Sequence, residues 1–249
     1  MSRPKPRAEN ELRYQRLLLA FTPCAALLLA LPAGGWWFAL AAPLTLWPTF
    51  VAAIRDDRDL RAWVAAVVWA GLLSVGVMFF VVYAPELAAR NILRGEAYRH
   101  EMWGWIETGV GREGSWRLFL PEHALHLAIF AGLALVSGGY LGLALGAALL
   151  AYMNYFVVAV MTASGDWAAG LAAAWFPWSI ARVLAFIAIG VLLARPLLKR
   201  SAWPFVPRHR QWVAWAAAGI LLDILLKFAL AAVYRERLER LVDSFGLGS

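Results

Sequence analysis

The chain alternates long apolar segments with short polar links, and this pattern restricts the fold more than any other feature of the sequence. Several of the apolar segments approach or exceed the roughly 18 residues that a helix needs to cross a bilayer. Seven such segments can be read: 17–33, 36–54, 62–84, 121–136, 141–163, 172–194 and 212–233. Hydrophobic residues make up 62% of the chain and charged residues 16%, against about 45–50% and about 25% in soluble domains. We therefore predict an all-α, polytopic integral membrane helix bundle with about seven transmembrane spans.

No long polar block divides the chain, so a single membrane domain, residues 1–249, is expected. The second apolar segment contains Pro43 and Pro48, which remove amide donors and predict a kinked or partly broken helix. If this segment is re-entrant, the bundle has six spans instead of seven. We expect, in order, a cytoplasmic tail (1–16), spans 1–3 (17–84), an outer-face interfacial segment (85–121), spans 4–7 (122–233) and an amphipathic tail (234–249).

Basic residues flank the apolar segments and indicate an orientation. With the N-terminus in the cytoplasm, the inner links carry 13 Lys and Arg residues and the outer ones 8. The positive-inside rule then favours a cytoplasmic N-terminus in a bacterial-type inner membrane. We assign the net charge of +7 to this bias and not to nucleic-acid binding. A cleaved signal peptide is the alternative for the basic start, but no good small-x-small cleavage site follows Leu31.

The segment between spans 3 and 4 holds most of the polar chemistry of the chain. Few helix breakers interrupt residues 85–106, where apolar residues mix with arginines, so we expect an amphipathic helical segment in the membrane interface. Three glycines after residue 108 predict a turn toward the bilayer. Three of the four histidines and five glutamates lie here or just beyond: His100, His123, His126, Glu96, Glu101, Glu107, Glu113 and Glu122.

Polar residues inside the apolar segments form the second candidate site, because lipid makes such residues expensive and therefore informative. At about 1.5 Å per residue, they fall at similar depths in the outer half of the membrane. We predict a substrate or ion pathway there, made of Asn154, Arg182, Asp223 and Lys227, with His126 at the same depth. A structural reading stays open, since Asp223 and Lys227 are four residues apart and can pair, with Arg182 completing a triad.

An enzyme is the alternative to a transporter. Glu101 or Glu107 would be the general base, and His126 would polarise the reacting carbonyl or bind a metal. Asn154 or Arg182 would stabilise developing negative charge. His123 and His126 share a helical face, and one glutamate would complete the three protein ligands of a catalytic zinc site. The reaction would be that of a membrane-embedded, possibly metal-dependent hydrolase or protease using residues 100–126.

Other functional classes lose support from the sequence. Cys24 is the only cysteine, which excludes an internal disulfide and any site with several cysteine ligands. No Walker A motif or CxxCH haem site is present, so neither nucleotide hydrolysis nor a bound cofactor is indicated. Gly142 and Gly146 have the GxxxG spacing that lets helices pack closely. The expected partners are the lipid bilayer and either further copies of this chain or other membrane subunits. The first function that we predict is a small transporter or a membrane subunit of a larger complex.

Overall fold

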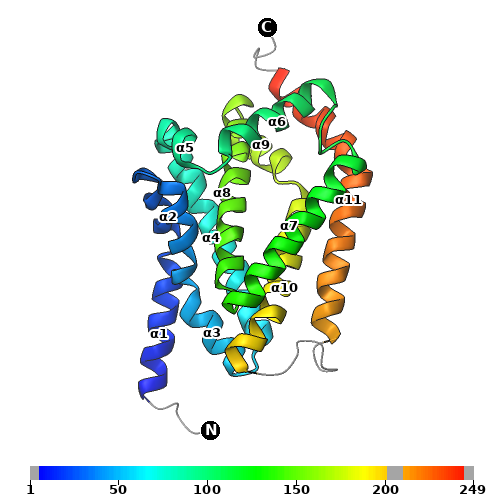
Figure 1. Ribbon diagram of the computed structural model, residues 1–249. Helices are drawn as coiled ribbons and strands as arrows, with labels where there is room; N and C mark the ends of the chain where they lie inside the picture. Colours follow the sequence, from blue (N-terminus) through cyan, green and yellow to red (C-terminus); the bar gives the residue numbers. More distant parts are fainter. Residues whose placement is uncertain (1–5, 201–209, 244–249) are drawn as a thin grey trace.

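A computed structural model describes residues 6–200 and 210–243, and all regular structure within these two ranges is helical (Figure 1). This result confirms the all-α prediction. The elements are α1 Pro6–Ala20, η1 Thr22–Ala30, α2 Gly34–Ala41, η2 Ala42–Thr45, α3 Trp47–Arg55, α4 Asp59–Tyr83, α5 Pro85–Asn91, α6 Gly95–Thr108, α7 Trp116–Ser137, α8 Tyr140–Ala163, α9 Trp167–Ala174, α10 Pro177–Lys199 and α11 Arg210–Asp243. The helices η1 and η2 are of the 3-10 type.

Five of the described helices are long and apolar enough to cross a membrane: α4, α7, α8, α10 and α11. A sixth crossing is possible through the pair formed by residues 34–45 and α3, which bends by 45°. The bend falls between Pro43 and Pro48, where missing amide donors interrupt the helical hydrogen bonds. The chain therefore folds as a polytopic helical bundle with five to six candidate spans.

The first apolar segment, 17–33, differs from the continuous helix expected for it. Helix α1 ends at Ala20, and the chain continues as the 3-10 helix η1. Pro23 occupies the first turn of η1, where its fixed φ and missing N–H are tolerated. Here η1 packs closely on α4: a Cβ on Gly76 would lie 2.4 Å from the Pro23 carbonyl oxygen.

At the end of the bundle near the start of α1, one link begins later than the sequence indicated (Figure 1). Helix α10 runs through Pro196 to Lys199, so Arg195 is helical and buried, although the apolar segment read from the sequence ends at residue 194 and left Arg195 in a loop over 195–211. Arg195 pairs with Asp57 at 2.5 Å and with Asp59, and Lys199 also pairs with Asp57. These ion pairs tie the α3–α4 link to α10. Most of the expected loop, with His209, lies outside the described residues.

The polar segment at the other end contains two helices instead of the single one expected. Helices α5 and α6 are separated at Ile92–Arg94, where Arg94 has the left-handed φ of 61°. Helix α7 begins at Trp116, so Pro121 lies inside it, although the apolar segment read from the sequence begins at this proline. In Figure 1, α5, α6 and α9 lie at the end opposite the N-terminus.

Helix α8 lies at the centre of the bundle and packs against α4, α6, α7 and α9, while α10 packs along α11. Gly138 and Gly139, with φ of 64° and 100°, join α7 to α8 in a tight reversal without charged residues. The sixth apolar segment, expected as one span over 172–194, is split into α9 and α10 by Trp175 and Phe176. Trp175 and Phe176 at this split line a cavity between α4, α8 and α10.

Candidate functional site

A small cavity of about 50 Å³ lies where α6, α7, α8, α10 and α11 meet the turn between α6 and α7. Most of its lining is ionisable, and we call it the charged cavity. Its lining residues are Arg94, Tyr98, Glu101, Arg112, Glu113, Glu122, His123, His126, Tyr152, Met153, Arg182 and Lys227. Residues of five helices and of the links on both sides of α6 therefore contribute to one site.

An ion pair at the border of the charged cavity joins α10 to α11. The Arg182 guanidinium donates two hydrogen bonds to the Asp223 carboxylate, of 2.9 Å from Nε and 3.0 Å from Nη2. Asp223 is almost completely buried, with 1% of its side chain exposed. This two-bond geometry is the preferred one between guanidinium and carboxylate groups. His123 Nε2 lies 3.6 Å from Asp223 Oδ2, so the imidazole is next to this pair.

Lys227 pairs with Glu113 instead of Asp223. Its Nζ lies 3.0 Å from Glu113 Oε2 and 4.4 Å from the centre of the Phe119 ring. Glu113 belongs to the turn between α6 and α7, so the ion pair anchors that turn over the cavity. Glu113 could not be selected among five glutamates from the sequence, because its partner lies more than 100 residues away on another helix.

Arg112 lies between two further carboxylates. It is 3.2 Å from Glu101 and 2.5 Å from Glu122, so it links α6 to α7 through the turn. Burial raises the pKa of the Glu101 carboxyl group, and the charge of Arg112 opposes that rise. Arg94 differs from these residues: it is exposed at the edge of the cavity and forms no ion pair with any residue in the described ranges.

Several buried polar atoms in this cavity have no hydrogen-bond partner among the described residues. They are both ring nitrogens of His123, Nζ of Lys227 and Oε2 of Glu113, of which the last two face each other as an ion pair. Buried polar atoms in folded proteins almost always have a partner, so each exception needs an explanation. The His123 imidazole is thus available for a hydrogen bond with a molecule inside the cavity.

The structure brings together some of the residues selected from the sequence and separates others. Glu101, His123, His126, Arg182 and Lys227 line the charged cavity, and Asp223 borders it through Arg182. Glu107 is exposed on another face of α6, and Asn154 lines a different cavity. Sequence reasoning missed Arg94, Arg112, Glu113 and Glu122 as site residues, and no local pattern distinguished them from the other charged residues of this segment.

The metal site considered from the sequence is not assembled. Among residues 6–200 and 210–243, no three His, Cys, Asp or Glu side chains are close enough to hold a metal ion. His123 instead lies close to the ion pair of Arg182, whose positive charge opposes a bound cation. Gly109, Gly111 and Gly114 match the spacing of a dinucleotide-binding loop, but this turn follows a helix and not the strand which that motif requires.

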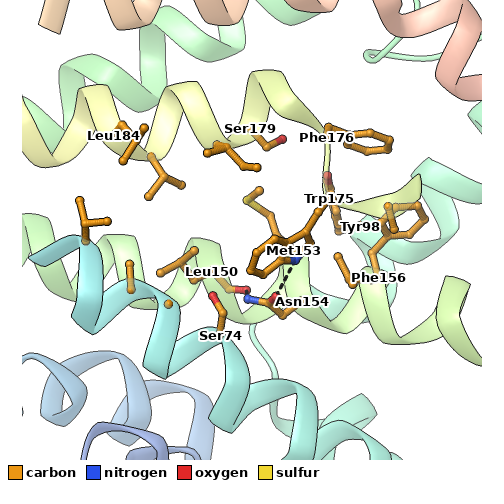
Figure 2. A pocket seen from close by; sticks show the side chains of 17 residues that line it. Ser74, Tyr98, Leu150, Met153, Asn154, Phe156, Trp175, Phe176, Ser179 and Leu184 are labelled. Atoms are coloured by element: carbon orange, nitrogen blue, oxygen red, sulfur yellow. Dashed lines mark hydrogen bonds between the residues drawn. The ribbon is translucent and has the colours of Figure 1, made fainter. Parts of the chain in front are cut away.

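A second cavity, of about 190 Å³, lies between α4, α8 and α10 and is lined mainly by apolar side chains. We call it the apolar cavity (Figure 2). Asn154 is one of its few polar residues, and its amide is already used: it donates to the Leu150 carbonyl and accepts from the Trp175 indole. Tyr98 and Met153 line both the apolar and the charged cavity, so the two are neighbours.

Comparisons with protein-family models, with curated proteins and with solved structures found no match to this chain.

Proposed function

We propose that the protein is a small transporter, or a membrane subunit of a larger complex, and that the charged cavity is its substrate-binding site. The observation that carries this proposal is the buried imidazole of His123, which has no hydrogen-bond partner among the described residues and lies beside two buried ion pairs. An arrangement that served stability alone would be expected to satisfy every buried polar atom, because each unmade hydrogen bond costs about 1–3 kcal/mol.

The proposal includes an orientation in a bacterial-type inner membrane. The N-terminus is cytoplasmic, α5 and α6 lie in the outer interface, and the charged cavity lies in the outer half of the bilayer. Seven spans result if α1 with η1 and the bent α2–α3 segment each cross the membrane. The distribution of basic residues supports this arrangement, as does the position of α5, α6 and α9 at the end opposite the N-terminus.

Arg94 gives this site a preference for negatively charged groups. The other cations of the cavity each face a carboxylate: Arg182 faces Asp223, Lys227 faces Glu113, and Arg112 lies between two glutamates. Arg94 is at the edge of the cavity and has no such partner in the described part of the chain. A substrate with a carboxylate or phosphate would supply one.

The test is a thermal-shift measurement on the detergent-purified protein with a panel of carboxylates, phosphates, cationic amines and uncharged solutes. A ligand at about 100 times its Kd stabilises the folded state by about 2.7 kcal/mol, which moves the melting temperature by several degrees. We expect an anionic class to raise the melting temperature of the wild type and of Arg90→Gln, an exposed arginine outside the cavity.

The informative variant is Arg94→Asn, since asparagine tolerates the left-handed backbone that Arg94 adopts. It is expected to fold like the wild type and to lose the shift. If the same compounds stabilise Arg94→Asn, His123→Ala and the wild type equally, or if no anion stabilises any of them, the charged cavity is not a substrate site.

A membrane-embedded hydrolase is the second candidate, and one observation favours it. Glu101 and His126, selected as base and electrophile, line the same cavity. If the protein is a hydrolase, its substrate would be cleaved inside the charged cavity. Wild-type protein should then hydrolyse fluorogenic acyl esters or peptides, and Glu101→Gln or His126→Ala should abolish turnover without unfolding. Normal turnover in both variants would remove the enzyme hypothesis.

A further inference from the structure

The apolar cavity has the size and lining of a site for hydrocarbon. Its volume is about 190 Å³, and an apolar cavity of about 150 Å³ in another protein stays dry and binds benzene. Figure 2 shows Leu150, Met153 and Phe156 of α8 facing Ser179 and Leu184 of α10 across it. Because the Asn154 amide is bonded within the protein, the cavity offers little to a polar occupant.

The mouth of this cavity opens on the side of the bundle that α4 and α10 present to lipid. Gly71, in the middle of the candidate span α4, lines the cavity, and no atom lies within 4 Å of where its Cβ would be. Across the mouth, Ile180 of α10 is 46% exposed. A hydrocarbon chain from the bilayer could thus enter sideways without passing through water.

The apolar cavity and the charged cavity are neighbours and share part of their lining. Tyr98 and Met153 line both, and an intermediate space of about 70 Å³ is lined by Met153 together with His123 and Arg182. Hydrocarbon contacts at one end and ionic groups at the other match a molecule with an apolar chain and a charged head. Neither a small hydrophilic solute nor a plain hydrocarbon would use both.

We infer that the substrate is an anionic amphiphile with a single apolar chain, which enters from the bilayer between α4 and α10. The chain occupies the apolar cavity, and the carboxylate or phosphate head lies in the charged cavity within reach of Arg94 and His123. This inference rests on the proposed function and names the substrate class of the same site. Headgroups of membrane lipids and free fatty acids share the required chemistry.

The experiment uses a clickable palmitic acid that carries a diazirine in its chain, with the matching hexadecanol as the uncharged probe. Wild-type protein in dodecyl maltoside is irradiated, and labelled peptides are identified by mass spectrometry. We expect labelling by the acid at α8 and α10 residues of the apolar cavity, competed by unlabelled oleic acid. Competition by lysophosphatidic acid in a parallel sample separates a phosphate head from a carboxylate head.

Two glycines provide a matched pair of variants. Gly71→Phe places a ring in the mouth of the cavity and should reduce this labelling by about tenfold. Gly132 on α7 lines none of the three spaces described above, and a Cβ there also meets no atom within 4 Å. Gly132→Phe should therefore leave the labelling unchanged. If Gly71→Phe fails to fold, Gly71→Leu replaces it. Arg94→Asn should lower labelling by the acid more than labelling by the alcohol.

Each outcome decides between the two proposals. Labelling that is spread over the outer surfaces of α7 and α11 and is unaffected by Gly71→Phe would overturn the inference, while the response to Arg94→Asn would still judge the charged cavity. Loss of labelling in Gly71→Phe with no effect of Arg94→Asn or His123→Ala would establish the chain site but reject the charged cavity as the site for the head. Equal labelling by acid and alcohol would overturn the anionic class.

Discussion

Asp223 and Lys227 lie one helical turn apart on α11, and each is paired with a residue of a different element. A local pair within α11 would neutralise both charges and contribute about 0.2–0.5 kcal/mol on a helix surface. The pairing that forms uses the same charges to hold α10 and the α6–α7 turn against α11. Neutralising one partner of a buried ion pair leaves the other charge uncompensated, and this lowers the stability of the fold much more than the loss of a surface pair does.

A double-mutant cycle tests this pairing at the level of single residues. We expect Lys227→Met and Glu113→Gln to be coupled by about 0.5–3 kcal/mol in the free energy of unfolding, as neighbours in one ion pair are. Arg182→Gln and Asp223→Asn should show coupling of similar size. Lys227→Met and Asp223→Asn should be more nearly additive, as measured by denaturation in detergent. Stronger coupling between Asp223 and Lys227 than between Lys227 and Glu113 would contradict the structure.

Glu96 provides a pH-dependent contribution outside the spans. Burial alone would raise the pKa of its carboxyl group, but the Tyr155 hydroxyl and the Arg99 guanidinium, both hydrogen-bonded to it, lower that pKa below its ordinary value of 4.5. A lowered pKa means that the ionised form stabilises the fold. The stabilisation is present above pH 4.5 and is lost as the pH falls through the lowered value.

Glu96→Gln should therefore flatten the loss of stability on acidification below pH 4.5, as measured by the melting temperature against pH. Glu86→Gln, an exposed carboxyl group on α5, is the control and should keep the wild-type profile. A Glu96→Gln profile as steep as that of the wild type would show that other groups cause the acid sensitivity.

The sequence identified the ionisable residues of the site more successfully than their partners. Arg182, Asp223, Lys227 and His123 stand out because charge is rare in apolar segments, and this rarity is visible in one dimension. The role of Glu113 depends on where a glycine turn lies in space, which no local pattern encodes. The pairing therefore became visible only in the fold.

At the scale of the helices, apolar length predicted where membrane segments occur, but not where each helix breaks. Helix α7 continues through Pro121, and η1 replaces an α-helix after Ala20. A proline near a helix start is compatible with several boundaries, and packing against neighbours selects one of them. The split of the sixth apolar segment between α9 and α10 was also unexpected. Trp175, which lies at this split, forms part of the wall of the apolar cavity.

Two glycines of α4 predict opposite responses to the same substitution. Gly76→Ala places a Cβ 2.4 Å from the carbonyl oxygen of Pro23, which is backbone and has little freedom to move. We expect a loss of about 1–3 kcal/mol, typical of overpacking, measured as a lower melting temperature. Gly71→Ala meets no atom, so the helix-favouring alanine should leave the melting temperature unchanged or raise it. Equal effects at both positions would show that η1 does not contact α4 in this way.

At the scale of the whole molecule, the chain places its polar connections at two opposite ends of the bundle (Figure 1). The end near the start of α1 carries the ion pairs of Arg195 and Lys199, and the other end carries α5, α6 and the charged cavity. Hydropathy and charge in the sequence were sufficient to predict this division. They could not predict the cavities, which depend on the packing of side chains from several helices.

Cysteine labelling on intact cells tests the proposed orientation. In a Cys24→Ser background, we expect Glu107→Cys on α6 to react with a membrane-impermeant maleimide. Asp56→Cys, in the exposed link between α3 and α4, should react only after the membrane is permeabilised. The readout is the mass increase of the labelled protein on a gel. Labelling in the reverse order would invert the topology and place the charged cavity in the cytoplasmic half of the bilayer.

The ion pairs of Arg195 also have a consequence for synthesis of the protein. Asp59 and Arg195 are separated by 136 residues, so at ribosomal rates of about 5–20 residues per second the arginine emerges about 7 to 27 s after the aspartate. During that interval α3 and α4 must already be in the membrane without their contact to α10. When Arg195 arrives, α3 and α4 become joined to α10, while α11 is still to be made. The contact thus marks a late step of assembly, which only a chain with correctly inserted early helices can complete.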